Sequence, residues 1–347
     1  TSFHFSGSDQ HAPKAYIQAS MHGAELQGNA VIAGLFSAFK QAPPLGDIAI
    51  VPHCNPIGGN HKVGEYTQGR FDPITGENWN RQYFYPGDAW ISAFAESHVA
   101  QNKADIYQAF RQALIDQLTE ELATSWQLSR GRLMTHMLQK MVYQADYVLD
   151  LHTGSQAARY LYVPAYAEAS AHYFHQEHVL LMDNVFGGAL DEASFCPWWT
   201  LEQKLRELGH NQATVPTVEA FTVELGSQEI VDMQRAQYEA QGILAYLSAK
   251  GVLPVGAYQP VDMVRHIAKS RDFITFHAPY GGLYEFLVAP GECVKQGQVF
   301  ARCLRVMQYG QQSMSIDIQA PISGQLVNQF DSAAVPKGAE LVKFLKN

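Results

Sequence analysis

The arrangement of apolar and polar residues in the first 255 residues indicates strands that alternate with helices. Short apolar runs at 15–21 (AYIQASM) and 47–52 (DIAIVP) are typical of buried strands, and residues 25–40 between them have the spacing of an amphipathic helix. The same criteria predict further strands at 147–151, 159–164 and 217–225, and further helices at 88–123, 130–145, 172–185 and 229–249. We therefore expect an α/β fold in which a mostly parallel, mixed sheet is flanked by helices.

Two regions depart from this pattern. Residues 55–87 are rich in glycine, proline, asparagine and aspartate, and the six aromatic residues among them favour a packed, functional loop over a disordered one. After Gly256 the chain changes to short strands separated by turns, with no helix of useful length. We place a boundary at 254–262, so that an α/β domain at 1–255 precedes a small all-β domain at 256–347.

Composition narrows the classes of function. The 24 basic and 33 acidic residues give a net charge of −9 without a basic run, which argues against nucleic acid and anionic membranes as partners. The four cysteines contain no CxxC pair, so we expect neither a disulfide framework nor a thiolate zinc site. Without a signal-like segment or an uncharged run near ~18 residues, a cytoplasmic protein is expected. A homodimer is expected only from the general frequency of twofold oligomers.

The strongest candidate chemistry is a metal site formed by His22, Glu25 and the distant His152. The first two lie three residues apart at a predicted strand-to-helix turn, and His152 ends the apolar run YVLDL. A catalytic zinc takes three protein ligands of this kind and leaves a fourth position for water. Asp150 is placed to orient a ligating imidazole, and Gly23 is expected to permit an unusual backbone turn. The alternative is that HxxE occurs by chance and that His152 is a core histidine with ordinary hydrogen-bond partners.

A buried acid at the end of a predicted strand is the second candidate. Glu224 lies inside the apolar segment TVELG, where an anion is costly unless it is paired or functional. Such a site raises the pKa of a carboxyl towards working pH, as a general base requires. The alternatives are an edge-strand glutamate that faces water or a structural ion pair. Glu219 is a nearby competitor, but its odd spacing from Glu224 places it on the opposite face of the strand.

Two arginines in the long loop are candidate anion-binding groups. Arg70 and Arg81, the latter in the segment ENWNR with Asn80, suit carboxylate binding or the neutralisation of a developing oxyanion. The alternative is that both are solvated surface residues. No GxGxxG, P-loop or GxSxG motif is present, so dinucleotide, phosphate-loop and serine-hydrolase functions lack their basic element.

Taken in order, the segments HGAE, RFDPITGENWNRQYF, DLHTG and TVELG resemble the succinylglutamate desuccinylase/aspartoacylase family, a deacylase branch of the zinc carboxypeptidase superfamily. The resemblance covers residues 15–250 and implies a zinc carboxypeptidase-like fold with one Zn²⁺ per chain. It implies His22, Glu25 and His152 as zinc ligands and Glu224 as general base. It also implies that Arg70 contacts the oxyanion and the substrate, and that Asn80 and Arg81 bind a carboxylate of the substrate. The sequence departs from the family at Asn78-Trp79, where an acidic residue and leucine are common, so the pocket wall differs.

The tail resembles a biotinyl/lipoyl-type barrel-sandwich domain through APGECVKQGQ and IQAPISG. A carrier domain needs a lysine on a hairpin tip, but Ser313 occupies that position and no lysine lies between Arg302 and Lys337. We therefore expect this domain to have a structural role or to cap the cleft. Tyr280 and Tyr284 are its candidates for a residue that reaches the active site.

These features together predict a zinc-dependent hydrolase that cleaves the amide bond of a small N-acyl amino acid or related acylated amine. A small-molecule acylated substrate is thus the expected partner. Two alternatives stay open: a metallocarboxypeptidase acting on peptides, which would share the metal site, and a non-catalytic binding protein of the same fold.

Overall fold

The computed structural model describes residues 1–310 and 313–346, and a mixed eight-stranded sheet forms the centre of its larger, α/β body. The strand order is β1-β3-β2-β6-β10-β8-β9-β11; β1–β3 and β10–β8 are antiparallel, and the other neighbouring pairs are parallel. The strands are β1 (Phe3–Phe5), β2 (Ala15–Ala19), β3 (Ile48–Val51), β6 (Tyr147–Gly154), β8 (Arg159–Pro164), β9 (His178–Met182), β10 (Glu219–Ser227) and β11 (His266–Lys269). The predicted fold class is confirmed.

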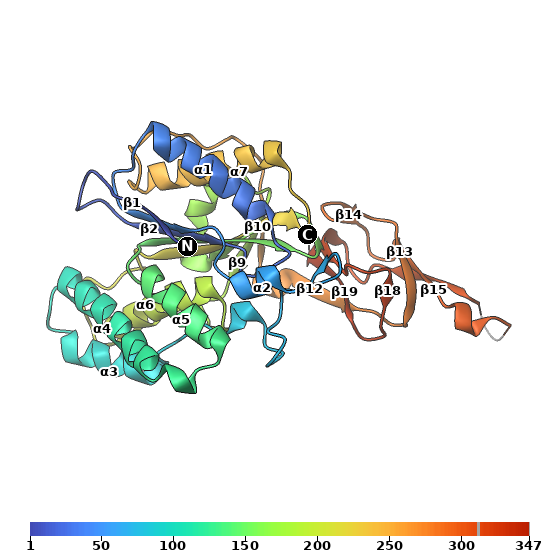
Figure 1. Cartoon of the computed structure of the whole chain (residues 1–347), viewed down its shortest axis with the longest axis horizontal. Helices are drawn as coiled ribbons and strands as arrows, with labels where there is room; N and C mark the ends of the chain where they lie inside the picture. The colour runs from blue at the N-terminus through green and yellow to red at the C-terminus, as the bar shows by residue number, and fades with distance from the viewer. Residues whose placement is uncertain (311–312, 347) are drawn as a thin grey trace.

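Helices cover both faces of this sheet (Figure 1). One face carries α1 (Gln27–Gln41) and α7 (Met233–Ala249); the other carries α3 (Asp88–His98), α4 (Lys103–Ala123), α5 (Arg130–Val142) and α6 (Leu190–Glu207). Neighbouring residues of the central strands enter different cores: Leu149 belongs to the cluster that includes α1 and α7, and Val148 to the cluster that includes α5 and α6. Because both faces are buried, these strands are continuous apolar runs in the sequence.

The α/β body departs from the predicted elements in three places. No α-helix forms at 172–185, where one was expected: the 3-10 segment η3 (Ala165–Tyr173) ends there and β9 follows. Residues 178–182 (HVLLM) form a strand because their consecutive apolar side chains are buried on both faces of the sheet. No element was assigned to 190–207, where the structure has α6 with Pro197 inside it. The helix expected at 88–123 is divided in two, and the Asn102 side chain accepts a hydrogen bond from the Asp105 backbone N–H at the start of α4.

The long loop between β3 and α3 has little regular structure, as expected. It contains one short helix, α2 (Pro56–Asn60), the hairpin strands β4 (Lys62–Val63) and β5 (Tyr66–Thr67), and the 3-10 turn η1 (Trp79–Arg81). Trp79 is fully buried and the Asp72 carboxylate pairs with Arg130 of α5 at 2.7 Å, so the loop is fixed against the α/β body.

The smaller β body consists of two packed sheets with their own apolar core. One sheet has the order β12-β19-β17-β14 and the other β16-β15-β13-β18. Their strands are β12 (Phe273–His277), β13 (Gly282–Phe286), β14 (Cys293–Val294), β15 (Val299–Leu304), β16 (Ser315–Gln319), β17 (Gly324–Gln329), β18 (Ala334–Val335) and β19 (Glu340–Lys346). Apart from the short 3-10 turns η4 (Ser270–Asp272) and η5 (Val306–Gln308), the described residues after Gly256 form no helix.

The two bodies are joined by more than one connection. β11, which follows the predicted boundary at 254–262, is the last strand of the large sheet. In the other direction, β7 (Gln156–Ala157), directly after β6, pairs with β17 of the β body. The strand that carries His152 therefore continues into the interface between the bodies. Within the described part of the chain, no helix is long and apolar enough to cross a membrane.

Candidate active site

The turn after β2 places His22 and Glu25 beside the carboxyl ends of the central strands. The positive φ in this turn falls on Ser20 (60°), and Gly23 does not have one. The Gly23 N–H instead donates to the Gly69 carbonyl at 2.9 Å, and a Cβ at Gly23 would lie 2.2 Å from the Gly58 oxygen. Glycine is thus required for close contact with the long loop, and the predicted reason, an unusual backbone turn, is wrong.

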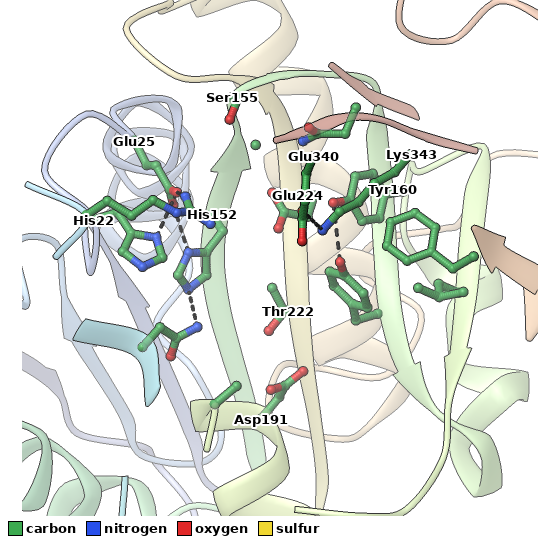
Figure 2. A pocket seen from close by; sticks show the side chains of 18 of the residues that line it. His22, Glu25, His152, Ser155, Tyr160, Asp191, Thr222, Glu224, Glu340 and Lys343 are labelled. Atoms are coloured by element: carbon green, nitrogen blue, oxygen red, sulfur yellow. Dashed lines mark hydrogen bonds and ion pairs between the residues drawn. The ribbon is translucent and has the colours of Figure 1, made fainter. Parts of the chain in front are cut away.

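Three buried side chains converge at this end of the sheet (Figure 2). One carboxylate oxygen of Glu25 lies 2.8 Å from Nδ1 of His22, and the other lies 2.7 Å from Nδ1 of His152. One donor atom from each residue lies within 4.8 Å of the others. The structure therefore brings together the residues that the spacing singled out, with two imidazole nitrogens directed at one carboxylate.

The outer nitrogens of both imidazoles also have partners. Nε2 of His22 lies 2.9 Å from the Asn78 side-chain oxygen, and Nε2 of His152 lies 2.8 Å from Oδ2 of Asp150. Asp150 is thus beside His152, where it was predicted. Such contacts fix the tautomer and the orientation of an imidazole, so that Nδ1 is directed towards Glu25.

The electrostatics of the cluster depend on burial and on mutual charge. Burial by itself would raise the pKa of Glu25, but His22 and His152 together hold that pKa well below its usual range. Burial lowers the pKa of His22. Burial also opposes protonation of His152, yet Asp150 and Glu25 together raise its pKa well above the usual value. A largely buried cluster of two imidazoles and one carboxylate has the donor set and the charge that a divalent cation requires.

Glu224 lies one strand further along the same edge. β10 pairs with β6 in parallel, and Glu224 is directly opposite His152 in the register. Its Oε2 is buried, and no donor among the described residues hydrogen-bonds to it. Burial, and secondly the charge of Glu25, raise the pKa of Glu224 to about 7. Glu219 faces the other way, as predicted: it pairs with Lys250, the residue after α7, at 2.6 Å.

The long loop contributes the remaining candidates. Nη1 of Arg70 lies 3.0 Å from Oε1 of Glu25, and the Arg70 side chain is 45% exposed. Asn80 is buried, with its amide nitrogen 3.4 Å from Nε2 of His152 and its amide oxygen accepting from the Leu190 N–H at 3.3 Å. Arg81 follows on the surface of the same cavity. All seven predicted site residues therefore line one cavity.

That cavity has a volume of about 560 Å³ and walls from both bodies. The β body supplies Asn328, Phe330, Glu340 and Lys343, which sequence reasoning missed because they meet the site only in the folded chain. Tyr284 is instead buried in the core of the β body and donates to the Tyr280 carbonyl, and neither tyrosine lines the cavity.

Three further lining residues come from the α/β body and were also missed. Tyr160 and Tyr162 of β8 line the cavity, and their spacing of two along a strand was the signal that could have placed them on one face. Asp191 was missed together with the helix that carries it, α6.

The comparisons with known proteins address the same region. The sequence model of the succinylglutamate desuccinylase/aspartoacylase catalytic domain matches residues 11–250. The chain belongs to the succinylglutamate desuccinylase/aspartoacylase family. Members of this family are deacylases, and the matched residues include every predicted site residue.

Solved structures extend the likeness to the whole chain. A protein named for succinylglutamate desuccinylase/aspartoacylase, from Shewanella frigidimarina NCIMB 400, is 41% identical; the match covers 100% of this chain and 92% of that one, with a TM-score of 0.95. A family protein from Shewanella amazonensis SB2B is 40% identical over 99% of this chain and 93% of that one, with a TM-score of 0.94. The product-bound ectoine utilization protein EutE (DoeB) from Ruegeria pomeroyi shares the fold, with a TM-score of 0.63 and 16% identity. The match covers 98% of this chain and 86% of that one. The comparison with curated proteins gave no match.

Proposed function

We propose that this family member is a zinc-dependent amidohydrolase that removes the acyl group from a small N-acyl amino acid or related acylated amine. The observation that carries the proposal is the pairing of two features. Glu25 is held between two buried imidazole Nδ1 atoms, and Glu224, whose Oε2 has no hydrogen-bond partner among the described residues, lies on the neighbouring strand.

His22, Glu25 and His152 would hold the metal, one ion per chain. Two neutral imidazoles and a carboxylate form a zinc ligand set that leaves a position for water, and the contacts of Asn78 and Asp150 to the outer nitrogens suit metal-binding histidines. When bound, the ion supplies water acidified towards a pKa of ~7 and a positive charge near the substrate carbonyl.

The side chains around the metal site have separate roles in proton transfer, charge stabilisation and substrate binding. Glu224 takes a proton from the attacking water and delivers it to the nitrogen of the leaving amine. Its raised pKa suits this exchange, because a base with a pKa near the working pH can both accept and return a proton. Arg70 stabilises the negative charge on the acyl oxygen, an interaction whose loss typically costs ~100- to 1000-fold in kcat. Arg81 and Asn80 bind the carboxylate of the substrate.

The shape of the cavity favours a small substrate over a peptide. Phe330 and Lys343 of the β body line the cavity together with Arg70 and Phe71 of the long loop, so the site is bounded by both bodies. A metallocarboxypeptidase would need room there for an extended chain.

Amine release from a panel of N-acyl amino acids tests the proposal. The panel contains formyl, acetyl, succinyl and longer acyl groups, and the controls are chelated protein and Glu224→Ala. We expect release that requires both zinc and Glu224. Release of C-terminal residues from tripeptides, with no activity on the panel, would support the peptidase instead. A zinc-bound protein that hydrolyses neither set would support a binding role.

The pH dependence follows from the burial of Glu224. The base acts only when ionised, and its pKa is raised, so kcat/KM should decrease as the pH falls through that value. Without metal this pKa is about 7, and a bound cation adds positive charge that lowers it. We therefore expect a plateau above pH 7 and, below the midpoint, a loss of about tenfold per pH unit. An activity that still rises between pH 8 and 9 would contradict this assignment.

A further inference from the structure

A buried carboxylate lies at the far end of the cavity from the β body. Asp191 is the second residue of α6 and only 4% of it is exposed, yet it lines the cavity. Figure 2 shows Glu224, Thr222 and Asp191 in succession along one side of the pocket. Glu224 and Thr222 share a face of β10 because they are two residues apart. Asp191 therefore lies beyond the proposed base, in the direction away from the β body.

Asp191 has no counter-charge in the described part of the chain. Its Oδ1 accepts a hydrogen bond from the Glu192 backbone N–H at 2.9 Å, and its carboxylate also contacts the Thr222 hydroxyl. No lysine, arginine or histidine of residues 1–310 and 313–346 forms an ion pair with it. Burial, and then the charge of Glu192, raise the pKa of Asp191 to about 7. A buried anion of this kind is costly unless a cation pairs with it.

A structural role at the start of α6 does not account for Asp191. An acid near a helix N-terminus is stabilised by the helix dipole, but Glu192 already has that role. Oε2 of Glu192 accepts hydrogen bonds from the Gly187 N–H at 2.7 Å and the Ala189 N–H at 3.1 Å. Glu192 also lines the cavity, but its Oε2 is engaged with these two N–H groups, so Asp191 is the nearly fully buried carboxylate of this turn that faces the cavity without capping the helix.

The proposed carboxylate-binding pair packs against the same turn. The Asn80 side chain accepts from the Leu190 N–H, one residue before Asp191, and Arg81 follows Asn80 along the cavity wall. A cation and an anion of the protein are therefore presented to the same part of the substrate. An amine portion that carries both a carboxylate and an ammonium group complements this pair of charges.

We propose that Asp191 binds a free ammonium group on the amine portion of the substrate, so that the substrate class is the mono-N-acylated diamino acids. The inference rests on the proposed function, since it assumes that an acylated amino acid is hydrolysed in this cavity. Asp191 acts here as a specificity-determining residue, and Arg81 takes the carboxylate of the same molecule.

An isosteric pair of substrates tests the inference without any mutation. Nα-acetylornithine and Nα-acetylnorleucine have side chains of equal length, and the ammonium of one is a methyl group in the other. An ion pair with a buried group is worth ~1.5–3 kcal/mol, so we expect kcat/KM of the zinc-loaded wild type to be about 10- to 150-fold higher for the ornithine compound. Nδ-acetylornithine, whose free ammonium is at the α position, shows which of the two amino groups Asp191 binds.

Asp191→Asn retains the shape and removes the charge, so the preference should be lost. Glu192→Gln is the matched control: it removes the neighbouring acid, which lines the same cavity but hydrogen-bonds the backbone at the start of α6, so we expect a lower melting temperature and an unchanged preference. Equal rates for the isosteric pair together with no faster hydrolysis of Nδ-acetylornithine in the wild type would overturn the inference, even if acidic or apolar acyl amino acids are hydrolysed well. A preference that survives Asp191→Asn would also overturn it.

A binding measurement separates this inference from the proposed function. If no acyl compound is hydrolysed, the proposed function fails, and calorimetry with the zinc-loaded protein then decides the inference. Ornithine should bind at least ~10-fold more tightly than norleucine, and Asp191→Asn should abolish the difference. Equal affinities would overturn the inference.

Discussion

Glu224→Gln is expected to lower kcat by about 1000-fold, the size of effect that removal of a positioned general base produces. The amide fits the same space but cannot accept the proton from water. Zinc content should stay near one ion per chain, because Glu224 is not in the cluster of His22, Glu25 and His152. The measurements are kcat on the best substrate of the panel and the zinc content by elemental analysis.

Glu219→Gln is the control for this prediction. It changes a glutamate of the same strand whose side chain lies on the opposite face, in an ion pair with Lys250, the residue after α7. We expect a lower melting temperature and an unchanged kcat. Turnover near the wild-type value in Glu224→Gln with zinc bound would show that another group, or no protein group, acts as base.

Removal of the metal is expected to abolish turnover and to destabilise the fold. In the chelated protein, Glu25 and the two imidazoles remain buried without the ion that their arrangement suits. A ligand at 100 times its Kd stabilises the folded state by ~2.7 kcal/mol, so zinc should raise Tm measurably and restore activity. Calorimetric scans and activity with and without added zinc are the measurements.

A matched pair of histidine variants locates the metal. His152→Gln should bind zinc substoichiometrically and lose the shift in Tm. His136→Gln changes another buried histidine, on α5, outside the cluster, and should bind zinc as the wild type does. Equal zinc content and equal Tm shifts in the two variants would place the metal elsewhere.

The sequence predicted the site better than the surroundings of the site. β2, β6 and β10 were recognisable because both of their faces are buried, which produces continuous apolar runs, and the polar residues that end these runs are conspicuous. His22, Glu25, His152 and Glu224 were therefore found from local patterns. Their separation in the chain did not matter, because parallel neighbouring strands bring these ends to one edge of the sheet.

Local patterns failed where the tertiary structure decides. Residues 172–185 contain histidines at helical spacing, but the apolar residues of HVLLM are buried in the sheet as β9, so packing overrides that pattern. Asp191 was missed because Pro197 interrupts the helical signal of α6. Lys343 and Phe330 reach the cavity only through packing of the β body against the α/β body, and no spacing in the sequence encodes that contact.

The pairing of β7 with β17 bears on the engineering of chimeras in this family. Gly154 has no room for a side chain, because a Cβ there would lie 2.6 Å from both the Ala157 Cβ and the Asn328 amide nitrogen. An exchange of the β body alone, with a crossover at 254–262, would separate Asn328 and Gln329 from the partner residues in β7. Recombinants that are intended to exchange the cavity wall should therefore transfer residues 154–157 together with β17 as one cassette.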